Sequence, residues 1–345
     1  MTDRKQRPAT EGGKHRRLLW VGLFLLIVAV GLPLADFAAF LSRSVTPPES
    51  QVVAVHPGEP FRRVAAVLER QGVVDSALRL RLLARWQGTA GRVQAGRYLF
   101  VDPATPGQVL ERLVRGDVLL RKITIPEGLT MVEIADRLQA ADVVSAADFL
   151  AACRNRTLLA KLGIDAPSLE GYLFPETYRV GEGISADELA SLMVAQFRAQ
   201  VSPELLEAAK KQGLNLRQLV TLASIIQKEA GNVDEMPLIS AVFHNRLKRG
   251  IALQADPTVI YGISDFDGNL TRKHLTTDTP YNTYMHPGLP PGPIANPGKA
   301  ALEAAAHPAD VDYLYFVANG KGSHVFAKTL AEHNANVRRY QLHRR

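Results

Sequence analysis

Cysteine is nearly absent from this sequence, with Cys153 the only one in 345 residues. A single thiol excludes an intramolecular disulfide framework and a metal site built from several cysteines, so the fold must depend on its hydrophobic cores. The nine histidines show no HExxH or comparable short ligand spacing. We therefore predict no metal site and no cofactor.

The chain also lacks a broad excess of basic residues. Its net charge is +7, but six Lys and Arg in the first seventeen residues, set against Asp3 and Glu11, carry more than half of it. No basic patch interleaved with aromatic residues occurs elsewhere. We predict no nucleic-acid partner.

Charge is missing altogether from residues 18–35, LLWVGLFLLIVAVGLPLA. This run is long enough to cross a bilayer core of about 30 Å. A cleaved signal peptide is the alternative, but the run exceeds a usual signal segment, and the one suitable cleavage site has Pro33 at its −3 position. We predict a basic cytoplasmic tail at 1–17, a transmembrane helix at 18–41, and a linker at 42–50. Because the basic residues precede the span, the rest of the chain is expected outside the cytoplasm.

Two segments repeat at a constant offset of 70 residues. GEPFRRVAAVLERQGVVDSALRL begins at Gly58, and GLTMVEIADRLQAADVVSAADFL begins at Gly128. Each copy has a strand-like lead, a turn glycine, an amphipathic helix and a second short helix, and an aromatic strand and a further helix lie between the copies. Two copies are too few for a solenoid, so we predict a small α+β module over 51–165.

Residues 166–345 are predicted to form a mixed α+β domain, which makes the fold class α+β. Helix-start signals occur at Ser185, at Ser202 with Pro203, and at Asn215, whose helix Gly231 is placed to end. A further helix is expected at about 235–248. The Pro- and Gly-rich stretch at 278–298 predicts an ordered loop, and NGKGSH at 319–324 predicts a turn.

One carboxylate in the stretch TLASIIQKEAGN, residues 221–232, lies on an apolar helical face. Glu229 follows Ile226, Ile225 and Leu222 at helical spacing. Apolar neighbours and the negative end of the helix dipole both raise a carboxyl pKa, which suits a proton donor near neutral pH. The alternative is that Glu229 points past the helix end into water.

Residues typical of a carbohydrate site follow this helix. LQADPTVIYGI at 253–263 places Gln254 and Asp256 immediately before an expected β-branched strand, and YNTY offers Tyr281 and Tyr284 on either side of Asn282. Tyrosine rings stack on sugar faces, while amides and carboxylates bind hydroxyls. Packing at the edge of the core is the alternative for the tyrosines.

Several motifs together resemble the MltG (YceG-like) family of endolytic murein transglycosylases. They are EGYLFPETY, ASIIQKEAG, VFHNRLKRGIALQADPTVIYG, TPYNTY, GLPPGPIANPG, AAAHP and YLYFVANGKGSHVF. The resemblance implies a single-pass inner-membrane protein with a LysM-like module at 51–165 and a YceG-like catalytic domain at 166–345. It further implies peptidoglycan glycan strands as substrate and peptidoglycan synthases as partners.

The resemblance implies that Glu229 is the catalytic acid. The family's first acidic position in this stretch is Gln227 here, which leaves Glu229 as the only carboxylate on the segment. Cleavage between N-acetylmuramic acid (MurNAc) and N-acetylglucosamine (GlcNAc) would then leave 1,6-anhydro-MurNAc ends, contributing to termination of glycan elongation. The substrate-binding candidates are Asn245, Gln254, Asp256, Thr258, Tyr261, Tyr281, Asn282 and Tyr284.

Two other functions remain open from the sequence. One is a hydrolytic muramidase that uses Glu229 and Asp256 with water. The other is a membrane-tethered scaffold that binds the wall through the LysM-like module, which could equally be a spacer.

Overall fold

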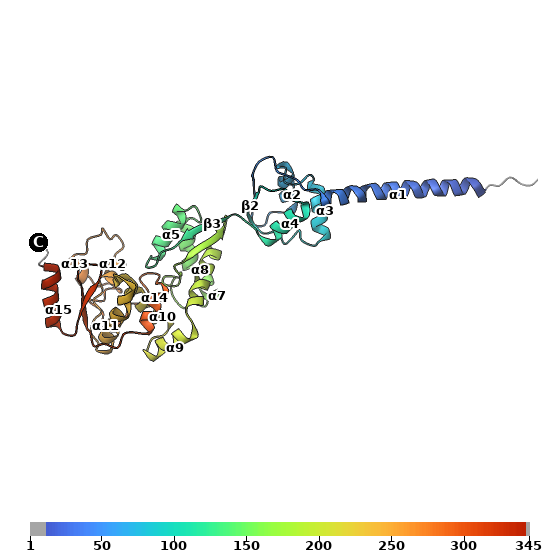
Figure 1. Ribbon diagram of the computed structural model, residues 1–345. Coiled ribbons are helices and arrows are strands. Elements are labelled where there is room, and N and C mark those ends of the chain that lie inside the picture. Colours follow the sequence, from blue (N-terminus) through green and yellow to red (C-terminus); the bar gives the residue numbers. More distant parts are fainter. Residues whose placement is uncertain (1–11, 343–345) are drawn as a thin grey trace, which may run out of the picture. The chain divides into compact units, whose positions relative to one another are not determined.

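The computed structural model describes residues 12–342, a mixed α+β chain in agreement with the predicted class. Its first element is the long helix α1, Gly12–Ser42, seen at the start of the chain in Figure 1. Within α1, the segment Trp20–Ser42 has a mean hydropathy of 2.3, and its length and composition are compatible with a membrane span. Residues 1–11 of the predicted basic tail lie outside the described residues.

The chain divides into two compact units. The first runs up to Leu119 and includes Gly181–Gly183, and the second holds the rest of the chain from Leu120. The two units meet at Leu119 and Leu120, earlier in the chain than the domain boundary predicted between residues 165 and 166. The predicted boundary concerns domains and stays a prediction.

The first unit is built around a two-stranded antiparallel sheet. Strands β1 and β2 pair with Val53 opposite Tyr98, and both side chains are fully buried against apolar helix faces. The Tyr98 hydroxyl donates to the carbonyl oxygen of Gln94 at 2.7 Å, which satisfies a polar group within this core. The elements are β1 Gln51–Val55, α2 Phe61–Arg70, α3 Ala77–Trp86, β2 Gly96–Phe100 and α4 Pro106–Arg115.

The second unit opens with a second copy of this arrangement. Helices α2 and α5 begin at Phe61 and Met131, which confirms the predicted 70-residue offset. The copy extends further than predicted, because β3 pairs with β4 and α8 follows as α4 follows β2. The elements are β3 Leu120–Thr124, α5 Met131–Ala140, α6 Ala146–Arg154, α7 Arg156–Lys161, β4 Thr177–Gly181 and α8 Ala186–Gln200.

Helix α10 is the central helix of the second unit. Every residue from Leu219 to Ile226 is buried, and the helix contacts α9, α11, α12 and α14. Asn215 caps it as predicted, since its side chain accepts from Gln218 N–H and the Gln218 side chain accepts from Asn215 N–H. Helix α10 and the longer helices that contact it are α9 Pro203–Lys211, α10 Leu216–Glu229, α11 Met236–Lys248 and α14 Lys299–Ala306.

The expected end of α10 is correct in position but not in cause. The helix ends at Glu229 with Ala230 as its extended C-cap, and Gly231 is not in the left-handed conformation. A Cβ at Gly231 would lie 2.7 Å from the carbonyl oxygen of Gly322. Glycine is needed here because another backbone approaches closely.

The expected β-branched strand after Asp256 is wrong, since the segment forms helix α12. Pro257 occupies the first turn, where its fixed φ fits and its missing N–H costs nothing. The Thr258 hydroxyl satisfies the carbonyl of Ala255 at 2.7 Å. Local helix-start chemistry therefore overrides the β-branched composition.

A hairpin and a terminal helix complete the unit. Strand β5 pairs antiparallel with β6, and the turn between them is the one predicted at 319–324. Residues 278–298 contain no regular helix or strand, as predicted. The remaining elements are η1 Val233–Glu235, α12 Asp256–Tyr261, α13 Arg272–Thr276, β5 Tyr315–Ala318, β6 His324–Ala327, α15 Leu330–Val337 and η2 Arg338–Leu342.

Candidate active site

A cavity of about 400 Å³ lies at the C-terminal end of α10. Its walls come from the loop before α12, the 278–298 loop, the β5–β6 hairpin, and the helices α15 and η2. The lining residues are Glu229, Arg246, Leu253, Gln254, Asp256, Tyr284, Phe316, Val317, Ala318, His324, His333, Val337 and Gln341.

Glu229 is the last residue of α10, so the helix delivers its carboxyl group to the cavity wall. Desolvation raises the pKa of Glu229 from 4.5 to about 7, and the negative charge of Asp256 adds to the rise. The Arg246 guanidinium opposes it. Burial is thus the main cause, as the apolar helical face predicts, and a second carboxylate is the next.

Asp256 is held in the same cavity by Tyr284. The phenol donates to Oδ1 of Asp256 at 2.6 Å. Asp256 is the first residue of α12, and Tyr284 is fixed by a bond of 2.9 Å from its backbone N–H to Oδ1 of Asn282. Two segments that the sequence singled out separately therefore meet at one carboxylate.

Gln254 lines the cavity in an uncommon backbone conformation. Its φ is +50°, and its N–H donates to the carbonyl of Thr283 at 3.1 Å. A side chain other than glycine in the left-handed region costs free energy and is enriched at binding and catalytic sites. Gln254 and Asp256 both line the cavity.

Arg246 is a cavity residue that the sequence analysis missed. Its guanidinium is buried and donates to the carbonyls of Leu314 at 2.7 Å and Leu253 at 2.8 Å, while lying 5.1 Å from the centre of the Tyr315 ring. In the sequence, the only indication that Arg246 belongs to the site was its place directly after His244 and Asn245 in α11. A buried cation beside Glu229 offsets the two carboxylates of the site.

Three predicted substrate-binding residues are instead bonded within the protein. Asn282 and Thr258 are fully buried, and neither lines the cavity. The Asn282 amide donates to three backbone carbonyls of the 274–277 segment, and Thr258 bonds to Thr283 at 2.8 Å. Asn245 donates to the carbonyls of residues 311 and 313. These residues shape the loops behind the cavity wall.

Tyr261 and Tyr281 pack against each other, with ring centres 4.9 Å apart, and are not among the cavity-lining residues. The Tyr261 hydroxyl donates to Oε2 of Glu170 at 3.2 Å. This is the packing alternative considered for the tyrosines.

Glu170 is a second buried glutamate, which the sequence analysis did not single out. Its carboxyl accepts from the backbone N–H of Met131 at 2.9 Å and from the amide of Asn296 at 2.9 Å. Burial raises its pKa from 4.5 to about 7. It ties the start of α5 to the 296 loop and to α12, so its place in EGYLFPETY has a structural reason.

Gln227, two residues before Glu229, points elsewhere. Its side-chain oxygen accepts from the backbone N–H of Gly298 at 3.0 Å. Lys228 likewise donates to the carbonyl of Gly128 at 3.3 Å. The end of α10 is thus anchored to two loops, while Glu229 alone of the three lines the cavity.

Comparison with known proteins agrees with these features. The chain is 33% identical over 299 residues to a protein of Bacillus subtilis named endolytic murein transglycosylase, a match that covers 82% of each chain. A Streptococcus pneumoniae protein of the same name is 28% identical, and the match covers 83% of this chain and 57% of that longer protein.

A solved structure is also similar to this chain. The crystal structure of a yceG-like protein from Listeria monocytogenes superposes with a TM-score of 0.57 and 33% identity, covering 83% of this chain and 98% of that one. The model of the YceG-like family matches residues 53–339. By its sequence and its fold, this chain belongs to the YceG-like family.

Proposed function

We propose that this protein is an endolytic lytic transglycosylase that cuts peptidoglycan glycan strands between MurNAc and GlcNAc. The carrying observation is Glu229, a carboxyl group with a pKa of about 7 at the wall of a 400 Å³ cavity. Such a group holds a proton near neutral pH and can donate it. The names of the relatives, endolytic murein transglycosylase, agree with this chemistry.

In the first step, Glu229 donates its proton to the glycosidic oxygen. The bond from that oxygen to C1 of MurNAc breaks, and positive charge develops at C1. The GlcNAc side leaves as the alcohol. Glu229 is now a carboxylate, and the nearby negative charge of Asp256 stabilises the cationic sugar.

In the second step, Glu229 takes the proton of the C6 hydroxyl of the same MurNAc. The C6 oxygen bonds to C1 and closes the 1,6-anhydro ring. The carboxyl group returns to its protonated form, and no water is consumed. One glutamate therefore serves as acid and then as base, unlike the carboxylate pair of ordinary glycosidases.

Asp256, Gln254 and Tyr284 are proposed to orient the sugar. Asp256 and the Gln254 amide offer hydrogen-bonding groups beside Glu229, and Tyr284 holds Asp256 in place. Neither group has to activate water in this scheme.

A hydrolytic muramidase is the second candidate, favoured by the presence of Asp256 in the same cavity as Glu229. Mass spectrometry of digested glycan separates the two reactions. Lytic cleavage leaves 1,6-anhydro-MurNAc ends, whereas hydrolysis leaves reducing MurNAc ends with the mass of one added water.

The main test is Glu229→Gln on polymerised glycan. It should abolish cutting, because glutamine cannot donate or accept the proton. Glu207→Gln, at an exposed position on α9, is the matched control and should cut normally. If Glu229→Gln retains full cleavage, the assignment of the acid is wrong. If wild-type protein binds the wall but never cuts it, the scaffold alternative holds.

The setting of the reaction is also a proposal. Helix α1 would anchor the protein in the inner membrane as a single span, with the N-terminus cytoplasmic and the catalytic domain outside the cytoplasm. The α+β segment at 51–165 would act as a LysM-like spacer or glycan-binding module, and peptidoglycan synthases would be partners. Protease protection in spheroplasts tests the topology, since residues after α1 should be digested from the outside.

A further inference from the structure

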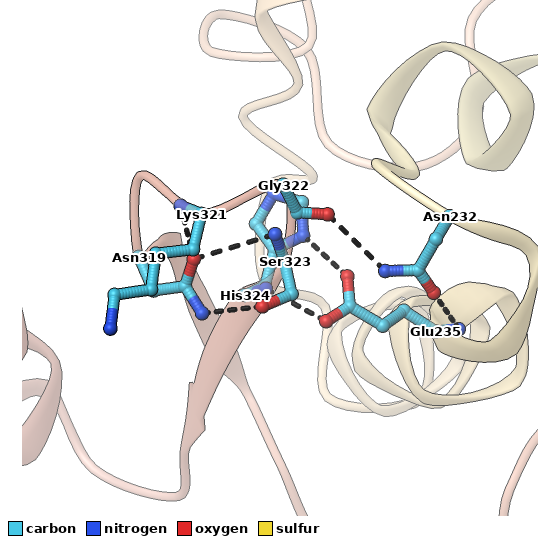
Figure 2. Close-up of polar contacts among 7 residues, drawn as sticks. All are labelled: Asn232, Glu235, Asn319, Lys321, Gly322, Ser323 and His324. Atoms are coloured by element: carbon cyan, nitrogen blue, oxygen red, sulfur yellow. Dashed lines mark hydrogen bonds and ion pairs between the residues drawn. The ribbon is translucent and has the colours of Figure 1, made fainter.

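The proposed mechanism does not use a carboxylate–imidazole pair formed by Glu235, at the end of η1, and His324, at the start of β6. Figure 2 shows Glu235 holding His324 at two points: Oε1 accepts from the backbone N–H at 2.8 Å, and Oε2 lies 2.9 Å from Nδ1. Both side chains are only 12% exposed. The histidine thus has one ring orientation and one partner for Nδ1.

The segment that follows the catalytic helix fixes this pair in space. The Asn232 amide donates to the carbonyl of Gly322 at 3.3 Å, and its oxygen accepts from the N–H of Glu235 at 3.1 Å (Figure 2). Gly231 packs directly on Gly322. Because Glu229 ends α10 two residues before Gly231, the hairpin and the catalytic acid share a short, rigid connection.

The proton positions of the pair follow from its hydrogen bonds. An ionised carboxylate only accepts, so Nδ1 of His324 carries the hydrogen, and in the neutral ring Nε2 has a free lone pair. Within residues 12–342, no hydrogen bond to Nε2 is formed and it is not among the enclosed unpaired atoms. His324 lines the same cavity as Glu229.

We propose that His324 is a substrate-binding residue whose Nε2 accepts a hydrogen bond from a sugar hydroxyl of the bound glycan, and that Glu235 is the residue that positions it. Glu235 sets the tautomer that makes Nε2 an acceptor. This inference rests on the proposed function, because it takes a glycan strand as the occupant of the cavity. If His324 only stabilised the hairpin, its Nδ1 bond to Glu235 would be enough, and Nε2 would have no role. Asn232 and the bonds within the 319–323 turn also hold the hairpin in place.

Two substitutions separate these roles, because each copies one ring nitrogen. His324→Asn places an amide N–H near Nδ1, which keeps the bond to Glu235 but leaves nothing at Nε2. His324→Gln reaches the position of Nε2 but loses the Nδ1 contact. We expect His324→Asn to lower kcat/KM about tenfold, mainly through KM, with an unchanged Tm, since one substrate hydrogen bond is lost. His324→Gln should be the more active of the two.

Glu235→Gln gives an independent test. The glutamine oxygen can accept from the backbone N–H of His324 while its NH₂ donates to Nδ1, so both contacts survive. The imidazole hydrogen must then sit on Nε2, which becomes a donor. We expect a loss of kcat/KM smaller than that of His324→Asn, in a protein with the wild-type Tm, because the sugar hydroxyl must turn from donating to accepting at Nε2.

The assay measures kcat and KM of each variant on one preparation of polymerised glycan, with detergent-solubilised protein. Wild-type kinetics in both His324→Asn and Glu235→Gln would overturn the proposal, as would a His324→Gln variant less active than His324→Asn. The chemistry of the product ends tests the proposed function separately: reducing ends from wild-type protein would refute lytic cleavage, while the ratios among variants would still report on His324.

Discussion

The phenol of Tyr284 donates a 2.6 Å hydrogen bond to Oδ1 of Asp256, in the cavity that also holds Glu229. This bond joins the first residue of α12 to the 278–298 loop. It fixes the second carboxylate of the site without neutralising its charge, since the tyrosine hydroxyl is the donor.

Removing this donor should reduce activity while leaving the fold intact. Tyr284→Phe keeps the ring and leaves Oδ1 of Asp256 free to turn, so we expect kcat/KM to fall about tenfold, in line with the loss of one charge-assisted hydrogen bond. Cleavage kinetics and the Tm measure the two effects. Tyr313→Phe, on the chain next to β5, is the control and should behave as wild type. Equal activity of both variants would show that the orientation of Asp256 does not matter.

The pH dependence of cleavage should report on Asp256. Glu229 must be protonated to donate, so activity falls as pH rises through its pKa of about 7. The charge of Asp256 is one cause of that raised pKa, and Asp256→Asn removes it. We expect the alkaline limb of the pH profile to move to lower pH. Asp310→Asn, an exposed substitution, should leave the limb in place.

A different result for Asp256→Asn would be informative. An activity loss of the same size at every pH, with an unmoved alkaline limb, would mean that Asp256 acts on the substrate and not on the proton affinity of Glu229.

Gln254 offers a test that separates side chain from backbone. At φ +50°, glycine fits without strain, whereas alanine keeps the strain and removes the amide. We expect Gln254→Gly to be more stable than Gln254→Ala by about 1 kcal/mol in denaturant unfolding. Both variants should show a similar rise in KM, because both lose the amide. Unchanged kinetics in Gln254→Gly would remove Gln254 from the substrate-binding residues.

Much of the fold could be predicted from local signals in the sequence. Asn215 and Gln218 identify the start of α10, and the 70-residue offset identifies the equivalent helices α2 and α5. The helical spacing of Glu229 with Ile225 predicts the burial of Glu229, and this burial is the main cause of its raised pKa. The cap and the helical spacing depend on residues within a few turns of one another, and the offset is a direct match between two segments of the sequence.

Sequence-based prediction failed where two local signals compete and where distant segments meet. β-branched residues after Asp256 predicted a strand, but Pro257 and Thr258 start a helix there. Amides such as Asn282 suit sugars and buried loop carbonyls equally well, and only the three-dimensional path of the loop decides between them. Arg246 and His324 reach the cavity from elements whose packing no local pattern reveals.

Glu170 predicts a pH dependence of stability. Burial raises its pKa from 4.5 to about 7, so between these values the folded protein holds a proton that the unfolded chain releases. The free energy of unfolding should therefore decrease as pH rises from about 4.5 to 7, by up to about 3 kcal/mol at 1.4 kcal/mol per pKa unit. Glu170→Gln cannot titrate and should flatten this slope.

Denaturant unfolding of detergent-solubilised protein at several pH values measures the effect, with Glu229→Gln in both proteins so that Glu229 does not titrate as well. Glu188→Gln is the control of opposite sign, because bonds from Ser185 lower the pKa of Glu188. The stability that Glu188 contributes is present above its unfolded pKa and lost as pH falls. Parallel stability curves for the Glu170→Gln protein and its parent would mean that Glu170 stays ionised in its buried network, held by its bonds from Met131, Asn296 and Tyr261.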